Sequence, residues 1–179
     1  MRLLYLLTAL LLPIYVQCQE IAENRIDDFL NTHIVKTDWV QINHPSEHLA
    51  FFRVSAIDSA YSIEYKKVVP KAYVVDRQPL LVKFKGSEEM MQLESSEKSQ
   101  SCNGCGARGF AGSDAWGIHL VYRLSNNAVQ RLRHEQISKI RIYTEQGYIE
   151  EDFTTEKQVK KALYFQKAFM LVMAEVEKK

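Results

Sequence analysis

Two of the chain's three cysteines, Cys102 and Cys105, stand three positions apart in a glycine-rich segment. Such a pair can form a local disulfide, act as a redox dithiol or supply two ligands to zinc. A redox dithiol normally lies where a helix begins, because the helix N-terminus lowers the pKa of the attacking thiol, and the glycines after this pair disfavour a helix. A zinc site would need further ligands, for which His119 or His134 is available. The sequence favours a disulfide, while the redox, zinc and free-thiol alternatives stay open.

Three other groups contain residue types suited to catalysis or metal binding. His44 and His48 would reach one metal if they lay on a helix, but their place between two expected strands favours a simple connection. The acids Glu150–Asp152 alternate in direction on a strand, and two of them face basic residues across a hairpin, which favours a structural role over acid and base catalysis. His119 is not accompanied by a recognisable nucleophile turn, so we expect it on the surface.

The N-terminus has the pattern of a signal peptide. Arg2 precedes an apolar run, Leu3–Tyr15, that is too short to span a bilayer comfortably. Cleavage after Cys18 would make residues 1–18 the signal peptide and residues 19–179 the mature chain. In the alternative, Cys18 is the first mature residue and carries a lipid, which would anchor the protein. The pattern predicts an exported protein, either periplasmic or secreted.

The composition is that of a folded chain with one domain. Hydrophobic residues make up 46% and charged residues 25% of the sequence, and the formal net charge is +1. A charge this small creates no strong field for nucleic acid or anionic lipid, and there is no long basic run interleaved with aromatic residues. We therefore expect no nucleic-acid partner, and membrane contact only through a lipid on Cys18.

The mature chain begins with a segment that is predicted to be helical, Glu20–Ile34, because its apolar residues recur roughly one or two helical turns apart. From Thr37 the period changes to two, and β-branched and aromatic residues become more frequent. The turns 58–59 and 86–88 each join two neighbouring strands. The pattern predicts five strands, at Thr37–Ile42, Leu49–Ile57, Ala60–Lys67, Pro79–Lys85 and Glu89–Glu94.

The segment 95–117 is rich in serine, glycine and small polar residues and has no periodicity, so we predict a long surface loop. A strand, Ala115–Leu124, follows, and Ser125 can cap a short helix over residues 126–135. A hairpin with its turn at Thr144–Gly147 comes next. The register that this turn imposes places Tyr143 opposite Tyr148, Ile142 opposite Ile149, Arg141 opposite Glu150 and Lys139 opposite Asp152.

A long helix is predicted to close the chain, with Thr155 and Gln158 at the spacing of a capping box. Its expected apolar face consists of Val159, Ala162, Leu163, Phe169, Val172 and Val176.

A pattern in the C-terminal part of the chain is formed by Ser125, Leu132, the stretch Lys139–Thr144 and the pair Gly147–Tyr148. With the strand that begins at Trp116, this pattern resembles small exported proteins of unassigned function from Gram-negative bacteria. In these proteins a strand, a short helix and a hairpin follow a glycine-rich loop. The resemblance implies this fold and export, and it implies no reaction. The cysteine pair is not part of it.

Together these observations predict a single α+β domain over residues 19–179. Its main feature would be a mainly antiparallel sheet or a small sandwich, with an N-terminal helix and a long C-terminal helix packed on it. Such a layout needs no cofactor to fold.

We expect a non-enzymatic binding or interaction module of the cell envelope, with a protein or glycan partner and with the loop 95–117 as the contact surface. The alternatives are a thiol-disulfide redox helper that uses Cys102 and Cys105, and a metal-binding protein.

Overall fold

The computed structural model describes residues 20–43, 49–69, 73–95, 97–106 and 116–178. Strands make up 49% of the structure and helices 21%, and the sheets are antiparallel. The expected α+β class is therefore wrong, because the described part of the chain is mostly β-sheet. Its two helices are α2 (Asn126–His134) and α3 (Glu156–Val176). The predicted signal peptide, residues 1–18, and the histidines at positions 44 and 48 lie outside the described residues.

The largest sheet has six strands in the order β1-β2-β4-β5-β10, with β3 paired to β4. Its strands are β1 (Ile21–Asp27), β2 (Thr32–Thr37), β3 (Val40–Gln41), β4 (Ala50–Ile57), β5 (Ala60–Val68) and β10 (Gly117–Arg123). A second sheet has the order β12-β11-β7-β8, and β6 pairs with β9. These strands are β6 (Val74–Asp76), β7 (Leu80–Phe84), β8 (Met90–Leu93), β9 (Lys98–Gln100), β11 (Ile137–Thr144) and β12 (Gly147–Asp152).

The predicted N-terminal helix, Glu20–Ile34, is instead the hairpin of β1 and β2. Its turn consists of residues 28–31, and Asn31 adopts a positive φ of 50°, which asparagine tolerates better than most residues. The apolar residues that suggested a helical face are not buried together, since Phe29 is 99% and Leu30 is 74% exposed. Turn-forming residues at 27–31 and the β-branched residues of β2 outweigh the helical spacing.

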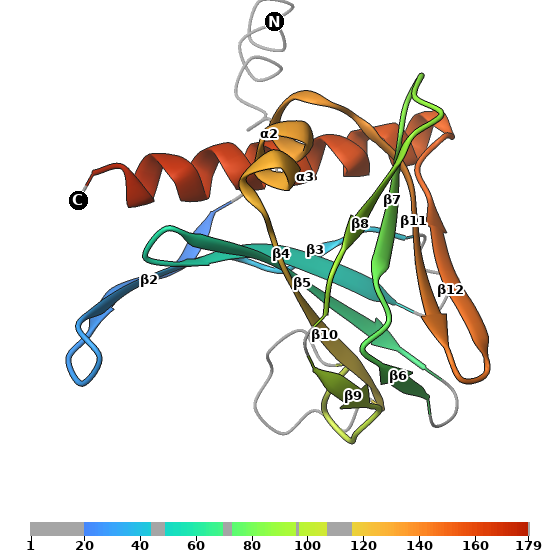
Figure 1. Cartoon of the computed structure of the whole chain (residues 1–179), viewed down its shortest axis with the longest axis horizontal. Coiled ribbons are helices and arrows are strands. Elements are labelled where there is room, and N and C mark those ends of the chain that lie inside the picture. The colour runs from blue at the N-terminus through green and yellow to red at the C-terminus, as the bar shows by residue number, and fades with distance from the viewer. Residues whose placement is uncertain (1–19, 44–48, 70–72, 96, 107–115, 179) are drawn as a thin grey trace, which may run out of the picture.

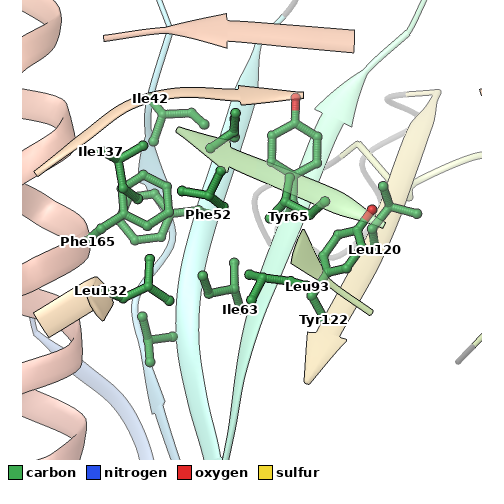
Figure 2. Close-up of a cluster of buried hydrophobic side chains, with 14 of the residues drawn as sticks. Ile42, Phe52, Ile63, Tyr65, Leu93, Leu120, Tyr122, Leu132, Ile137 and Phe165 are labelled. Atoms are coloured by element: carbon green, nitrogen blue, oxygen red, sulfur yellow. The ribbon is translucent and has the colours of Figure 1, made fainter. Parts of the chain in front are cut away.

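The six-stranded sheet buries one of its faces, hereafter the inner face, in the core. Helix α3 packs against β2 and β4, where Phe165 stacks on Phe52 with their ring centroids 3.6 Å apart (Figure 2). Figure 1 shows α3 lying across the strands as a long rod. The second sheet supplies side chains to the same core, which includes Val54, Ile63, Leu120, Val82, Phe84, Ile140 and Ile142.

The C-terminal predictions are largely confirmed. The Ser125 side chain accepts a hydrogen bond from the Ala128 N–H and caps α2, and Val129 and Leu132 are buried. The hairpin of β11 and β12 has the expected register, from Lys139 opposite Asp152 to Tyr143 opposite Tyr148. In α3, Thr155 is the N-cap residue, but its side chain makes no capping hydrogen bond. The buried residues of α3 are Ala162, Phe165, Ala168, Phe169 and Val172, while Leu163 is 39% exposed.

The segment 95–117 is described only in part, and the described part is not all loop. Lys98–Gln100 form β9, which pairs with β6 and lies beside β10. This strand is three residues long, which is too short for a period of two to be recognised in the sequence.

Candidate functional site

The second face of the six-stranded sheet, hereafter the outer face, carries a polar row across four neighbouring strands. Lys36 of β2 lies opposite Ser55 of β4, which lies opposite Ser62 of β5, which lies opposite Arg123 of β10. Directly paired residues of antiparallel strands point to the same side of a sheet, so these four side chains share the outer face. The row thus places two hydroxyl groups between two cationic side chains.

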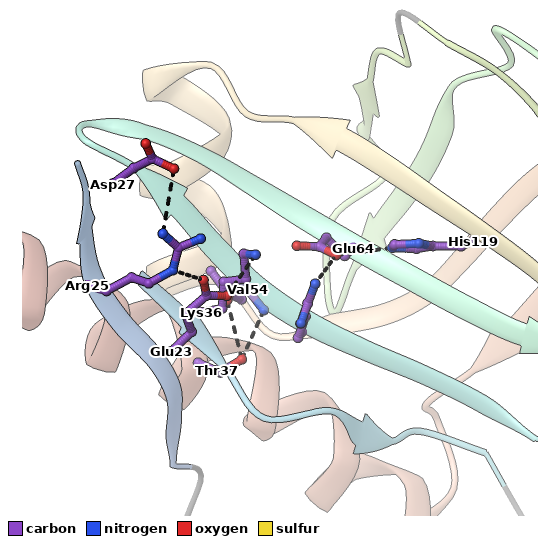
Figure 3. A network of polar contacts seen from close by, with 9 residues as sticks. Glu23, Arg25, Asp27, Lys36, Thr37, Val54, Glu64 and His119 are labelled. Atoms are coloured by element: carbon purple, nitrogen blue, oxygen red, sulfur yellow. Dashed lines mark hydrogen bonds and ion pairs between the residues drawn. The ribbon is translucent and has the colours of Figure 1, made fainter. Parts of the chain in front are cut away.

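A second row on the outer face lies two residues away from the first on both β4 and β5, and it contains a buried carboxylate. Glu64 is opposite Arg53, and its side chain is 8% exposed. Its Oε2 accepts a hydrogen bond from Arg53 Nη2 at 2.6 Å and lies 3.0 Å from Nε2 of His119 (Figure 3). Trp39 covers this cluster, because the Arg53 guanidinium and the Lys66 ammonium lie 4.4 and 4.5 Å from its ring centroid.

These contacts set the charge of the cluster. Burial raises the pKa of Glu64, but the hydrogen bonds from His119 and Arg53 outweigh that effect and lower it from 4.5 to about 2. Burial, with the nearby Arg53 charge, lowers the pKa of Lys66. Glu64 therefore stays ionised at neutral pH and holds Arg53 and His119 in place.

Next to this cluster, the outer face is hollowed into a groove of about 550 Å³. This volume lies in the range of small-ligand and peptide-binding pockets. Its polar lining, by which we define the groove, consists of Lys36, Arg53, Ser55, Ser62, Glu64 and Arg123. Of its three cationic side chains, Arg53 is bound to Glu64 and Lys36 is bound to Glu23 at 2.8 Å. Arg123 makes no ion pair among the described residues and gives the lining its unbalanced positive charge.

The groove also has apolar walls. Ile57 and Val121, which are 52% and 39% exposed, line it together with Tyr61 and Leu124. Ile57 stands one row beyond Ser55 on β4, so apolar and hydroxyl-bearing residues adjoin on the outer face. A ligand that fits this lining combines a negative charge with an apolar portion.

Several hydrogen-bond donors of the groove are unused. The side chains of Ser55, Ser62 and Arg123 make no hydrogen bond or ion pair with any residue that the structure describes. The Nε atom of Arg53 is buried and has no acceptor among those residues. Hydroxyl and guanidinium donors at one place are the groups that bind carboxylates and other oxyanions.

The two cysteines form the expected disulfide, outside the groove. Cys102 and Gly117, at the start of β10, exchange backbone hydrogen bonds of 2.9 and 3.1 Å. A Cβ on Gly117 would lie 2.3 Å from the Cα of Gly106, so the two backbones touch at a point that only glycine permits. The disulfide and this contact fix the segment to the sheet, which accounts for the pair as a structural feature.

The three consecutive acids Glu150–Asp152 are all bound to basic groups. Glu150 and Asp152 pair with Arg141 and Lys139 on the neighbouring strand, as the sequence predicts. The middle acid, Glu151, points into the core, where its Oε1 accepts hydrogen bonds from Tyr65 Oη at 2.9 Å and Lys67 Nζ at 2.5 Å. The buried position of Glu151 and its partners on β5 were not visible in the sequence.

A second hollow, of about 450 Å³, lies between the N-terminal hairpin and the end of α3. Its polar groups mostly bind one another, since Asn24 donates to Glu175 at 3.0 Å and lies 2.7 Å from His33 Nε2. The His33 Nδ1 atom is buried and has no partner in the part of the chain that is described. Because this atom is closed off from solvent, a ligand in the hollow would not reach it.

Sequence reasoning placed His119 on the surface but missed its partners. Glu64 and Arg53 could have been paired from the turn at 58–59, because a two-residue turn fixes the register of the hairpin. His119 reaches Glu64 because β10 pairs with β5. The two residues are 55 positions apart in the chain, so the local sequence around neither of them predicts the contact.

Within the described ranges, no group of three or more His, Cys, Asp or Glu side chains is placed to hold a metal ion. Neither of the described helices is long and apolar enough to cross a membrane. Comparisons with protein-family models, curated proteins and solved structures find no match to this chain.

Proposed function

We propose that the protein is an exported, non-enzymatic binding module, and that its groove holds an acidic polypeptide segment of a partner. The observation that carries the proposal is the set of unused donors on Ser55, Ser62 and Arg123 beside the exposed apolar side chains of Ile57 and Val121. A carboxylate would satisfy the donors, and an adjoining apolar side chain would cover the walls.

The shape of the polar row favours a polypeptide over a ligand with a single charged group. Lys36 and Arg123 stand three strand spacings apart, which corresponds to roughly 14 Å across the sheet. A floor of this width, with Arg123 at one end and Lys36, which is bound to Glu23, at the other, suits a segment of several residues. Arg123 makes no ion pair in the described structure, so its charge is available to such a segment.

The proposal is tested by fluorescence anisotropy with a labelled hexapeptide of sequence EEFLEE and the matched basic peptide KKFLKK. We expect the acidic peptide to bind and the basic peptide not to bind, with an affinity that falls as salt is added. Arg123→Glu should weaken the binding of EEFLEE by at least about tenfold.

A control variant distinguishes the effect of changing the groove from the effect of changing the protein's net charge. Lys83→Glu makes the same kind of charge change on β7 of the second sheet, where Lys83 is exposed and does not line the groove. It should leave the affinity for EEFLEE unchanged. Equal losses in the two variants, or equal binding of both peptides, would contradict the proposal.

A further inference from the structure

The turn of the N-terminal hairpin displays apolar side chains in a fixed geometry. We call residues 27–31, with the turn at their centre, the tip. Asp27 Oδ1 accepts hydrogen bonds from the backbone N–H groups of Phe29 and Leu30, both at 3.0 Å. These bonds hold the backbone of the turn, so that Phe29 and Leu30 both project from the end of the hairpin into solvent.

The exposure of the tip is unusual for a folded protein. Phe29 is 99% exposed, Leu30 is 74% exposed, and Ile26 beside them is 53% exposed. Figure 1 shows the β1–β2 hairpin extending away from the rest of the molecule. Neighbouring apolar side chains held out by a hydrogen-bonded turn are the anchors typical of contacts between proteins.

The charges of the tip indicate which kind of surface it can bind. Asp27 and Asp28 directly precede the apolar pair, and the backbone hydrogen bonds from Leu30 and Phe29 lower the pKa of Asp27 and keep it negative. Arg25 is the nearby cation, and it is bound to Glu23 and Asp27. An acidic tip is repelled by an anionic bilayer and is attracted to a positive surface with apolar walls.

The groove of this same chain is a positive surface with apolar walls. Its lining contains Arg123, which has no ion pair among the described residues, and Lys36, which is bound to Glu23, with Ile57 and Val121 exposed beside them. The tip and the groove also lie toward the same end of the six-stranded sheet. The His33 N–H bonds to Asp58 in the turn of the next hairpin, and β2 runs beyond that turn into the tip.

We infer that the tip of one copy of this chain docks in the groove of a second copy, with Phe29 and Leu30 against the apolar walls and Asp27 and Asp28 facing the cations. This inference rests on the proposed function, because it names the segment that the groove holds. Two such contacts close a dimer if each copy gives its tip to the other.

The test is sedimentation velocity of the purified protein at rising concentration. We expect the wild-type protein to self-associate reversibly, and more weakly at high salt. A tip variant, Phe29→Ser with Leu30→Ser, and a groove variant, Arg123→Glu, should each remain monomeric. Both change exposed residues, and circular dichroism would verify that each is folded.

Mixing the two variants makes the test specific. The groove variant has an intact tip and the tip variant has an intact groove, so an equimolar mixture should form a heterodimer that neither forms alone. This dimer has one contact in place of two and should be weaker than the wild-type dimer. A mixture that stays monomeric would overturn the inference, and so would self-association that survives Arg123→Glu.

The peptide experiment separates the two proposals. If EEFLEE binds the groove while the wild-type protein stays monomeric at every concentration, the self-docking inference is wrong and the groove serves another partner. If neither the peptide binds nor the protein associates, both proposals are wrong.

Discussion

The two faces of the six-stranded sheet are built from alternate residues of the same strands and have opposite characters. On the inner face, Phe52, Val54 and Ile63 are at most 1% exposed and lie beneath α3 and the second sheet. On the outer face, the intervening positions carry Arg53, Ser55, Ser62 and Glu64, which line an open groove. The inner face forms the apolar core of the fold. The outer face has unused donors that folding does not require, which points to binding.

The first and largest expected effect concerns the inner face. Phe165→Ala removes the ring that stacks on Phe52 and should lower the free energy of unfolding by about 3–5 kcal/mol. Phe29→Ala is the matched control, because it deletes the same ring at a position that is 99% exposed, and it should change stability by less than about 0.5 kcal/mol. Urea unfolding of both variants measures the difference, and similar losses would contradict the assignment of the core.

The second effect concerns the buried cluster under the outer face. Glu64→Gln leaves the Arg53 guanidinium without its counter-charge and should lower stability at neutral pH by about 2–4 kcal/mol. Glu88→Gln, at an exposed position of the β7–β8 turn, is the control and should have little effect.

The contribution of Glu64 to the free energy of unfolding should depend on pH, in a direction that its lowered pKa determines. The pKa of Glu64 is lowered on folding, from 4.5 to about 2, so its stabilising effect is complete above pH 4.5 and is lost as the pH falls toward 2. The difference in unfolding free energy between wild type and Glu64→Gln should therefore shrink over this interval. A difference that stays constant down to pH 2 would show that Glu64 is not held ionised by Arg53 and His119.

The disulfide gives an intermediate effect. Replacing both Cys102 and Cys105 by serine opens a short covalent ring and should lower stability by about 2 kcal/mol. The ring lies outside the groove, so the affinity for EEFLEE should not change. Loss of peptide binding in this double variant, measured by anisotropy, would mean that the segment around the disulfide takes part in recognition.

The smallest expected effect on stability belongs to the groove. Ser62→Ala with Arg123→Gln removes donors that have no partner in the described structure, so stability should change by less than about 0.5 kcal/mol. The affinity for the acidic peptide should nevertheless fall by about tenfold or more. A large loss of stability would show that these side chains serve the fold, and the contrast between the two faces would then be wrong.

The sequence predicts best where local chemistry decides the structure. Ser125 caps α2, and the charges of Arg141 and Glu150 agree with the register that the turn at 144–147 imposes. At the N-terminus, Ile26, Phe29 and Leu30 have helical spacing, but the turn bonds of Asp27 and the pairing with β2 produce a hairpin. Hydrophobic periodicity misleads there because these three residues are 53–99% exposed and form no buried helical face.

The groove could not be predicted from the sequence because one of its sides comes from a strand that is distant in the chain. The turn at 58–59 could have predicted that Arg53 lies opposite Glu64 and Ser55 opposite Ser62. The other side of the groove is Arg123 and Val121 of β10, which joins β5 across more than fifty residues of chain. That pairing depends on how the whole sheet assembles, and the outer-face residues of β10 do not specify a partner strand.

The most direct test of the groove is a titration of isotopically labelled protein with EEFLEE, followed by backbone amide NMR. The account predicts chemical-shift changes that centre on Ser55, Ser62 and Arg123 and leave the core residues of α3 unchanged. Changes confined to the segment 97–106 or to the β11–β12 hairpin, or no changes at saturating peptide, would contradict it.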